Sequence, residues 1–334
     1  MKNQSTTKRN GKIEIIKKNS FRKGFITAFI IVFAIVGACF LIQYIGWNTI
    51  TEYFRLSEVN VIVSQPADGE IQVHFIDVGQ GDAILIISDV STVLIDSGDT
   101  KYTSRVIDYI RRLEVEQLDL IIATHPHADH IGGLDKVIAQ IGADMIITPL
   151  IEEKYRPKTA IYNRKHEAIE KYEVEHLYAK SGFIYQLNDS GTAYIEVLGP
   201  NTCCDFEKSM NNHSVVVKLT HGVNTFLFTG DIEREAEDCL LDNDIDLSAT
   251  VLKIAHHGSR TSSRRAFLDA VSDDSKINYA VVSVGSPNRY NHPNDDVLKL
   301  LDALEFSVYR TDVHGHIVFV SRPDELEIFY SEAA

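Results

Sequence analysis

The sequence predicts an α/β fold in which two β-sheets pack face to face and helices cover their outer faces. The chain has 334 residues, of which 44% are hydrophobic, so it can bury a large core. Each half of the body after residue 69 supplies strand-length apolar runs first and amphipathic helical runs later. Two stacked sheets with helices outside would bury all of these apolar faces.

The first half of the body begins with a meander of strands and then alternates strands with helices. Apolar runs bounded by glycine-containing turns predict strands over Ile71–Val78, Ala83–Ile87, Thr92–Asp96, Leu118–Ala123 and Met145–Thr148. Apolar residues at helical spacing predict helices over Ser104–Leu113 and about Gly133–Ile141, followed by a polar, helical middle region.

The second half repeats this order. Strands are predicted over Tyr194–Leu198, Ser214–Leu219, Thr225–Thr229, Thr250–Ile254 and Ala280–Val284. Helices are predicted over Glu233–Leu241, Arg264–Val271 and Asn294–Leu304, and Asn294 is the expected N-cap of the last one. No internal repeat interrupts this half.

The N-terminal segment predicts a single membrane anchor over residues 24–47. Residues 24–51 carry no charge, and the apolar run exceeds the ~7–15 residues of a cleaved signal peptide. Basic residues just before the run place residues 1–23 in the cytoplasm and the body outside the cell membrane. A cleaved signal peptide remains the alternative, and Val36–Cys39 loosely resembles a lipoprotein processing box. Residues 48–69 form the linker to a domain over residues 70–334.

Charge is divided unevenly along the chain. Residues 1–47 hold eight basic residues and one acid, so this segment has a net charge of +7. The whole chain has a net charge of −14, so the remaining residues carry −21. An acidic body argues against broad, charge-driven binding of a polyanion, although local basic patches remain open. The four cysteines include no CxxC pair, which excludes a thiolate metal cage and gives no repeating disulfide framework.

The densest set of metal-ligand residues follows the strand Leu118–Ala123. His125 and His127 point the same way in an extended chain, so they can bind one metal ion together. Asp129 and His130 follow at the start of a helix. The alternative is a solvated polar loop. Further donors follow later strands, where Asp231 is either a turn acid or a ligand, and His256 and His257 form an adjacent imidazole pair.

These motifs resemble the metallo-β-lactamase fold, an αβ/βα four-layer sandwich with a dinuclear metal site at one edge. The resemblance extends from about Ile71 to Val320 and is strongest to the C-terminal hydrolase domain of ComEC-type competence DNA-uptake proteins. The segments that carry it are His74–Ala83, His256–Ser259, Asn288–Pro293 and Tyr309–Asp312. ComEC proteins have many membrane spans and this chain has one apolar run, so the expectation is a stand-alone, anchored relative.

The resemblance implies a ligand set for two divalent ions, Zn or Mn. His125 and His127 would hold one ion, and Asp129, His130 and His257 would hold the other, with Asp231 as the bridge. His213 is left open as a ligand, a substrate contact or a loop residue. Spacing does not decide which of His256 and His257 binds metal, but a likeness to secreted phosphorylcholine esterases favours His257.

The resemblance also implies roles around the ligands. Asp129 would orient the attacking hydroxide, while His256 and Glu233 would face the substrate, with His256 acting on the leaving oxygen. Asp96 would support a metal-binding histidine. Asp77 and Asp82 flank a turn that the resemblance places near the site. The alternative is an ordinary polar turn between two strands. The remaining expected substrate contacts are Asn212, Ser259, Arg289, Tyr290 and His292.

The predicted function is metal-dependent hydrolysis of phosphodiesters outside the cell, with single-stranded DNA as one form of the substrate. Arg260, Arg264, Arg265 and Arg289 could offset the acidity of the body near the site, or they form a solvated face. One alternative is a phosphorylcholine-esterase-like or phosphomonoesterase activity on cell-surface polymers. Another is a non-catalytic, metal-stabilised module that binds DNA or a surface. The sequence predicts no oligomeric state.

Overall fold

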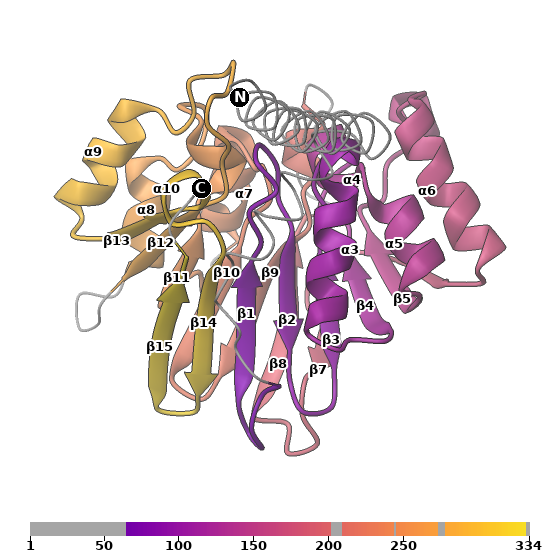
Figure 1. Cartoon of the computed structure of the whole chain (residues 1–334). Coiled ribbons are helices and arrows are strands. Elements are labelled where there is room, and N and C mark those ends of the chain that lie inside the picture. Colours follow the sequence, from indigo (N-terminus) through magenta and orange to yellow (C-terminus); the bar gives the residue numbers. More distant parts are fainter. Residues whose placement is uncertain (1–64, 202–208, 244, 273–277, 332–334) are drawn as a thin grey trace, which may run out of the picture. The chain divides into compact units, whose positions relative to one another are not determined.

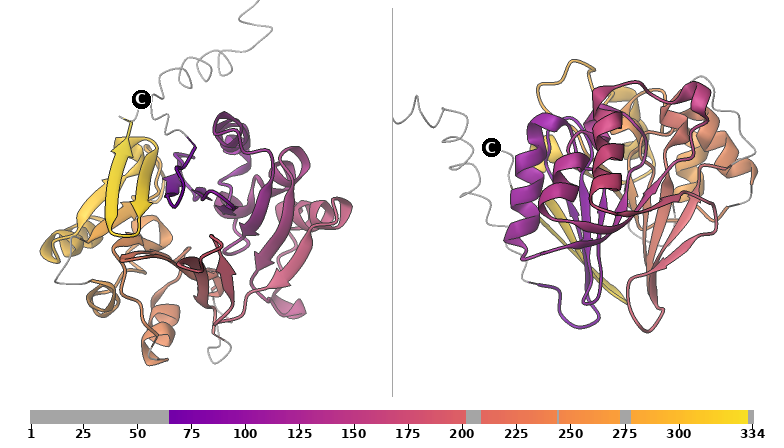
Figure 2. Two further views of the ribbon diagram at one scale, coloured as in Figure 1. Left: turned by 90° about the horizontal axis from the view of Figure 1, so that it is seen from below. Right: turned by 90° about the vertical axis from the view of Figure 1, so that its right-hand side faces the viewer.

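The computed structural model describes residues 65–201, 209–243, 245–272 and 278–331. They form two β-sheets packed face to face with helices on the outer faces, which confirms the predicted architecture (Figures 1 and 2). The predicted cytoplasmic segment, the anchor and most of the linker lie outside these residues. Among the residues described, no helix has the length and apolar character needed to span a membrane.

The first sheet has the strand order β15-β14-β1-β2-β3-β4-β5-β6. Its β1, β2 and β3 pair antiparallel, and β3, β4, β5 and β6 pair parallel. The carboxyl ends of the parallel strands therefore meet at one edge. The strands span Ile71–Phe75 (β1), Ile84–Ile87 (β2), Thr92–Ile95 (β3), Leu118–Ile122 (β4), Ala143–Thr148 (β5), Glu175–Tyr178 (β6), Ile317–Arg322 (β14) and Glu325–Tyr330 (β15).

The second sheet has the order β13-β12-β11-β10-β9-β8-β7 and repeats the change from antiparallel to parallel pairing at β10. Its strands span Ile184–Gln186 (β7), Ala193–Gly199 (β8), Val216–His221 (β9), Asn224–Phe228 (β10), Val251–Lys253 (β11), Tyr279–Val282 (β12) and Ser307–Arg310 (β13). Loops after β4, β10 and β11 carry the predicted ligands, so both sheets contribute to the site.

Helices lie on the two outer faces (Figure 1). The first sheet carries α3 (Thr103–Arg112), α4 (Ala128–Ile131), α5 (Leu134–Gln140) and α6 (Ala160–Lys171), and the second carries α7 (Arg234–Asp242), α8 (Arg265–Val271) and α9 (Asp295–Ala303). Short turns are η1 (Thr100–Tyr102), η2 (Glu153–Tyr155), η3 (Asn211–His213), η4 (Ala255–Gly258) and α10 (Thr311–His314). Asn294 caps α9 as predicted, because its side chain accepts a hydrogen bond from the Asp296 N–H.

Three layers of apolar packing hold the sandwich together. Phe75, Phe226, Phe228 and Phe319 contact one another between the sheets, with ring centroids 5.8–6.3 Å apart. Alternate residues of β1 face the opposite way, where His74 bonds to Tyr109 of α3 at 3.0 Å. Burying a large apolar side chain stabilises the fold by ~1.5–3 kcal/mol, so this double-sided burial fixes the register of each strand.

Several elements differ from the predictions. The region that was predicted to be polar and helical contains α6 but also the strands β6 and β7. The residues of both strands are exposed or only partly buried, and several of them are polar. The strands β13, β14 and β15 at the C-terminal end were not predicted. β1 ends at Phe75 instead of Val78, since the following residues turn so that the Gly79 N–H donates to Asp77 Oδ1 at 2.8 Å.

Cysteine usage also differs in one respect. Cys239, buried on α7, is disulfide-bonded, although the cysteine spacing gave no disulfide framework. The other cysteines of the sequence, Cys39, Cys203 and Cys204, lie outside the described residues. Spacing could not reveal this bond because disulfide connectivity depends on tertiary proximity.

Candidate metal centre

The loop after β4 carries the first ligand motif. His125 is buried and His127 is exposed, and His125 Nε2 lies 3.0 Å from His127 Nδ1. The two rings therefore present nitrogens to the same point, as the alternation of an extended chain predicts. α4 begins directly after His127 and turns Asp129 and His130 in a different direction.

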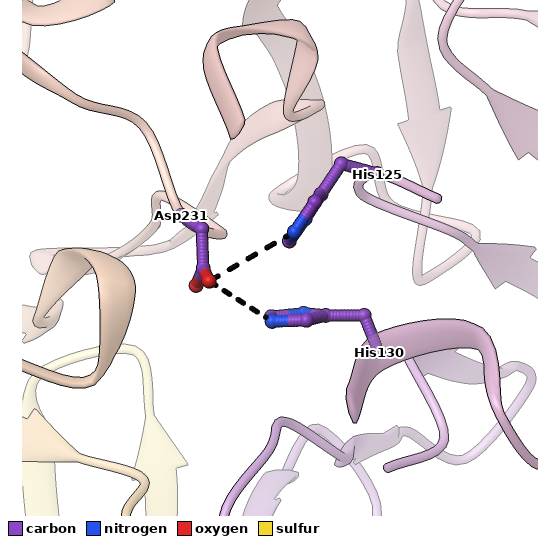
Figure 3. Close-up of side chains that lie close together, drawn as sticks. All are labelled: His125, His130 and Asp231. Atoms are coloured by element: carbon purple, nitrogen blue, oxygen red, sulfur yellow. Dashed lines mark ion pairs between the residues drawn. The ribbon is translucent and has the colours of Figure 1, made fainter. Parts of the chain in front are cut away.

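Asp231 lies at the centre of the site. It follows β10 and Gly230, whose φ of +52° is a left-handed conformation that glycine adopts without steric cost. The Asp231 N–H donates to Ser214 Oγ at 3.0 Å, which holds the loop in place. Asp231 Oδ2 lies 3.2 Å from His130 Nε2 and 3.8 Å from His125 Nε2 (Figure 3).

The η4 turn after β11 sends its two histidines in different directions. Both have positive φ, 51° for His256 and 55° for His257. His257 is buried; its Nδ1–H donates to the Ser283 carbonyl at 2.8 Å, and its Nε2 lies 3.5 Å from both Asp129 Oδ2 and Asp231 Oδ2. His256 is partly exposed, and its Nε2 is 3.9 Å from Asp231 Oδ2. The structure thus places His257 deeper among the carboxylates than His256.

Four overlapping sets of three donors lie close enough to share an ion. They are His125, His130 and Asp231; Asp129, His130 and His257; Asp82, Asp96 and His130; and Asp82, Asp231 and His257. In the described part of the chain, neither His127 nor His213 belongs to such a set. His213 lies in η3 and is partly buried. The ligand roles of His127 and His213 stay predictions.

The site fits a divalent cation on chemical grounds. His130 Nε2, His257 Nε2 and Asp231 Oδ1 are sealed from solvent and find no hydrogen-bond partner among the described residues. A buried polar atom left in this state costs ~1–3 kcal/mol, whereas a bound ion would satisfy all of them. Imidazole and carboxylate donors without thiolate suit Zn²⁺ or Mn²⁺. His130 and His257 would hold such an ion with Asp129, and His125 and His130 would hold one with Asp231.

Mutual attraction governs the charges of the metal-free site. Burial opposes the charged form of Asp231, but His130 and His257 hold its pKa well below the usual range. Burial likewise opposes protonation of His257, yet Asp231, Asp129 and Asp82 raise its pKa to about 10. Protons on these imidazoles therefore compensate the carboxylates where a divalent ion would otherwise do so.

Residues behind the ligands fix their orientation. Asp96 accepts from His130 Nδ1 at 2.7 Å and from Thr124 Oγ1 at 2.6 Å, so the predicted support of a metal-binding histidine has a direct contact. Asp82 is buried, with Oδ1 3.4 Å from His257 Nδ1 and Oδ2 2.6 Å from Lys253 Nζ. Asp77 lies farther out, where its Oδ2 is 3.4 Å from Arg105 Nη1.

The predicted substrate-side residues fall into two groups. His256 Nδ1 lies 3.4 Å from Glu233 Oε1, and the hydrogen bond from His256 lowers the pKa of Glu233 to about 2. The ring centroid of His292 is 5.5 Å from that of His256, and Tyr290 stacks on His292. The exposed Arg289 donates to Tyr290 Oη at 2.7 Å.

The other two predicted contacts are buried and engaged within the protein. Asn212 Oδ1 accepts from the Glu233 N–H at 2.8 Å, and its Nδ2 donates to Glu235 at 3.1 Å. Ser259 Oγ lies 3.0 Å from Thr261 Oγ1. Both side chains therefore shape the loop that holds Glu233 and His256, and their contact with a substrate stays a prediction.

Sequence reasoning missed four residues of the site. Thr124 and Ser214 bond to the acids Asp96 and Asp231, Lys253 pairs with Asp82, and the Ser283 carbonyl orients His257. Thr124, Ser214 and Lys253 had a local signal, since each stands next to or just before a candidate ligand. Ser283 had none, because it reaches the site from the loop after β12.

Comparison with known proteins agrees with this geometry. A sequence profile described as the metallo-beta-lactamase superfamily matches residues 76–281. ComE operon protein 3 of Bacillus subtilis is 29% identical over 270 residues, covering 75% of this chain and 33% of its own length. Competence protein ComA of Neisseria gonorrhoeae is 28% identical over 254 residues, covering 75% and 32%. The chain thus spans about a third of these relatives.

Two solved structures are similar at low sequence identity. YhfI of Bacillus subtilis, a metallo-beta-lactamase fold protein, has a TM-score of 0.47 and 13% identity and covers 75% of this chain and 100% of its own. The metallo hydrolase Igni18 of Ignicoccus hospitalis has a TM-score of 0.46 and 16% identity, with 77% and 98% covered. The superfamily profile covers more than half of the sequence and includes the ligand loops after β4, β10 and β11, so this chain belongs to the metallo-β-lactamase superfamily of hydrolases and is related to these competence proteins.

Proposed function

We propose that this protein is a dinuclear metal-dependent phosphodiesterase whose substrate is a nucleic acid strand such as single-stranded DNA. The observation that carries the proposal is the convergence of His130 Nε2 and His257 Nε2 on one oxygen of Asp231, at 3.2 Å and 3.5 Å, with Asp129 Oδ2 also 3.5 Å from His257 Nε2. An arrangement of buried imidazoles around a carboxylate is suited to hydrolysis of charged esters.

When bound, divalent ions would lower the pKa of a water molecule and neutralise the charge that develops on a phosphoester. The residues of the chain supply position and protons. Asp129 is partly exposed and adjoins His257, so its free carboxylate oxygen can orient the attacking water. His256 faces solvent, and Glu233 holds its Nδ1, which leaves Nε2 to protonate the leaving oxygen.

Glu233 is itself firmly held. It accepts hydrogen bonds from Ser209 at 2.8 Å, Thr261 at 3.1 Å and Asn211 at 3.3 Å. These donors favour the ionised carboxylate and fix its position. A carboxylate held this way can keep the ring of His256 in one orientation through the reaction.

Two observations support the substrate class and the compartment. The related protein of Neisseria gonorrhoeae is named a competence protein, and the sequence motifs resemble those of competence DNA-uptake proteins. The basic residues before the N-terminal apolar run support an extracytoplasmic domain, because such residues stay on the cytoplasmic side of a membrane span. We propose that the N-terminal apolar run anchors the domain in the cell membrane with its catalytic edge outside.

The test is hydrolysis by the full chain in detergent micelles with Mn²⁺ or Zn²⁺ added. Substrates are a single-stranded 12-mer, bis(p-nitrophenyl) phosphate, p-nitrophenyl phosphate and p-nitrophenyl phosphorylcholine. We expect cleavage of the first two, and at least a 100-fold loss for Asp231→Asn. Asp242→Asn, on the exposed end of α7, is the matched control and should keep full activity.

Each alternative gives a different result in this assay. Cleavage confined to the monoester would assign a phosphomonoesterase, and cleavage confined to the phosphorylcholine ester would assign an esterase of that class. Tight binding of the 12-mer without cleavage of any substrate would assign a binding module. Any of these three outcomes would overturn the proposal.

A further inference from the structure

A second cluster of basic and aromatic side chains lies away from the metal centre, on α6 and the edge strand β6. It consists of Tyr162, Lys165 and His166 from α6 and His176 and Tyr178 from β6, and is called the α6–β6 cluster below. The centroid of the His166 ring lies 4.5 Å from that of Tyr162 and 5.6 Å from that of His176. The ring centroids of His176 and Tyr178 are 4.9 Å apart. Helix and strand thus bring these side chains together.

Lys165 is a buried cation with no acidic partner among the described residues. Its side chain is only 3% exposed, and burial alone accounts for a lowering of its pKa to about 8. Within the described ranges, no carboxylate lies within ion-pair distance of its ammonium, which lies 4.8 Å from the centroid of the Tyr162 ring. Asp135 instead forms an ion pair with the neighbouring Arg164, whose Nε lies 3.0 Å from Asp135 Oδ2.

The basic groups beside His166 are Lys165, His176 and Arg156. Burial, together with these three groups, lowers the pKa of His166 to about 4. His166 Nε2 is sealed from solvent and has no hydrogen-bond partner in the part of the chain that the structure describes. The buried Lys165 and the exposed Arg156 therefore carry the positive charge of the cluster, and the two histidine rings beside them are neutral at neutral pH. An anion would relieve both the unpaired ammonium and the unsatisfied nitrogen.

The α6–β6 cluster lies on the same sheet edge as the metal centre. β4, β5 and β6 are neighbouring parallel strands, with Ile122 opposite Ile147 and Thr148 opposite Tyr178. The ligand loop follows β4 directly. Tyr178 ends β6, which is separated from β4 by one strand, β5. Strands lie ~4.8 Å apart, which puts the cluster ~10 Å along the edge from that loop. Figure 1 shows α6 and β5 at this end of the sheet.

We propose that the α6–β6 cluster binds a phosphate group of the substrate strand, one or two nucleotides away from the phosphodiester at the metal centre. This inference rests on the proposed function. Lys165 and Arg156 supply the positive charge, and the neutral ring of His166 supplies an N–H donor, for recognition of a phosphate. Tyr178 is 50% exposed and offers a ring on which the adjoining base can stack.

The test separates strand binding from catalysis. Binding of a fluorescent single-stranded 12-mer by the full chain is measured by anisotropy in EDTA, where no hydrolysis occurs. We expect Lys165→Met to weaken binding about tenfold, because it removes a charged hydrogen-bond donor. The matched control is Lys171→Met, an exposed lysine on the same helix, which should bind within twofold of the wild type. Arg156→Gln, an exposed change that cannot disturb the core, should weaken binding in the same direction.

Turnover gives an independent readout. With metal present, Lys165→Met should raise KM for the 12-mer about tenfold and leave kcat/KM for bis(p-nitrophenyl) phosphate unchanged, because that small ester cannot reach ~10 Å. Equal 12-mer binding by wild type, Lys165→Met and Arg156→Gln would overturn the inference. Lys165-dependent binding of phosphatidylglycerol vesicles without binding of the 12-mer would also overturn it, in favour of a lipid headgroup. An absence of all hydrolysis with Lys165-dependent 12-mer binding would refute the proposed function alone.

Discussion

Asp96 Oδ2 accepts a hydrogen bond from His130 Nδ1 at 2.7 Å, and both side chains are completely buried. This contact fixes the tautomer of His130, so that Nε2 faces Asp231. Asp96 itself has a φ of +57°, an uncommon conformation for a residue other than glycine. The backbone is thus bent at the end of β3 in the place where the carboxylate can reach the ligand loop after β4.

Replacing Asp96 with Asn should weaken metal binding. Loss of an acid that orients a metal-binding histidine typically lowers metal affinity ~10–100-fold. The measurement is a competition titration with a metal chelator, followed by metal analysis. Asp119→Asn is the matched control, because Asp119 is a hydrogen-bonded acid at the other end of β4, where its Oδ2 accepts from the Thr92 N–H at 2.7 Å. Equal metal affinity in both variants would contradict the role of Asp96.

Alanine at His256 and at His257 should have different consequences. His257→Ala removes a buried nitrogen that faces Asp129 and Asp231, so bound metal should fall. His256→Ala should keep the metal and lower kcat ~100–10,000-fold, as expected for loss of a proton donor. Metal content and kcat are measured on the same preparations. Metal loss in His256→Ala with full occupancy in His257→Ala would reverse the assignment.

Acid should destabilise the protein through two buried histidines that belong to none of the metal-binding sets, His74 and His316. Burial lowers the pKa of His74 to about 3, and burial with nearby arginines lowers that of His316 to about 3. An unfolded histidine titrates near 6.5, so the unfolded state takes up protons first. The contribution of each neutral histidine is complete above pH 6.5 and is lost as the pH falls toward 3.

Urea unfolding between pH 7.5 and pH 5 measures this effect. Each histidine should remove about 1.4 kcal/mol from the free energy of unfolding for each pH unit below 6.5. In His316→Gln, the unfolded state should take up about one proton fewer. The slope of the free energy of unfolding against pH should therefore decrease by about 1.4 kcal/mol per pH unit. The slope is the decisive quantity, because the substitution also changes the absolute stability. An unchanged slope would show that His316 is protonated in the folded protein.

Gly81→Ala should damage the metal site through the backbone. Gly81 has a φ of +137°, and a Cβ there would lie 2.3 Å from the Asp129 carbonyl oxygen. The Asp129 loop would have to move, so metal affinity and stability should both fall. Gly182→Ala is the control, since Gly182 has a φ of +83° with no atom within 4 Å of an added Cβ. It should cost only ~1 kcal/mol of stability and leave metal affinity unchanged.

Much of this architecture could be predicted from local patterns. Runs such as Leu118–Ile122 and Asn224–Phe228 are apolar on both faces because both faces are buried, and both strands were predicted. β6 and β7 were missed since their residues are only partly buried and carry polar side chains. An edge strand has a neighbour on one side only and needs less apolar surface, so its sequence signal is weak.

The sequence by itself determined the ligand motif, since His125, His127, Asp129 and His130 lie within six residues on a strand end. It also determined the two-sheet class, which follows from hydrophobic periodicity. Only the tertiary structure decided which distant groups meet there: Asp231 with His130, Asp82 with Lys253, and His257 with the Ser283 carbonyl. The physical reason is that local spacing sets the direction of neighbouring side chains, whereas contacts between loops depend on strand order and on how the two sheets pack.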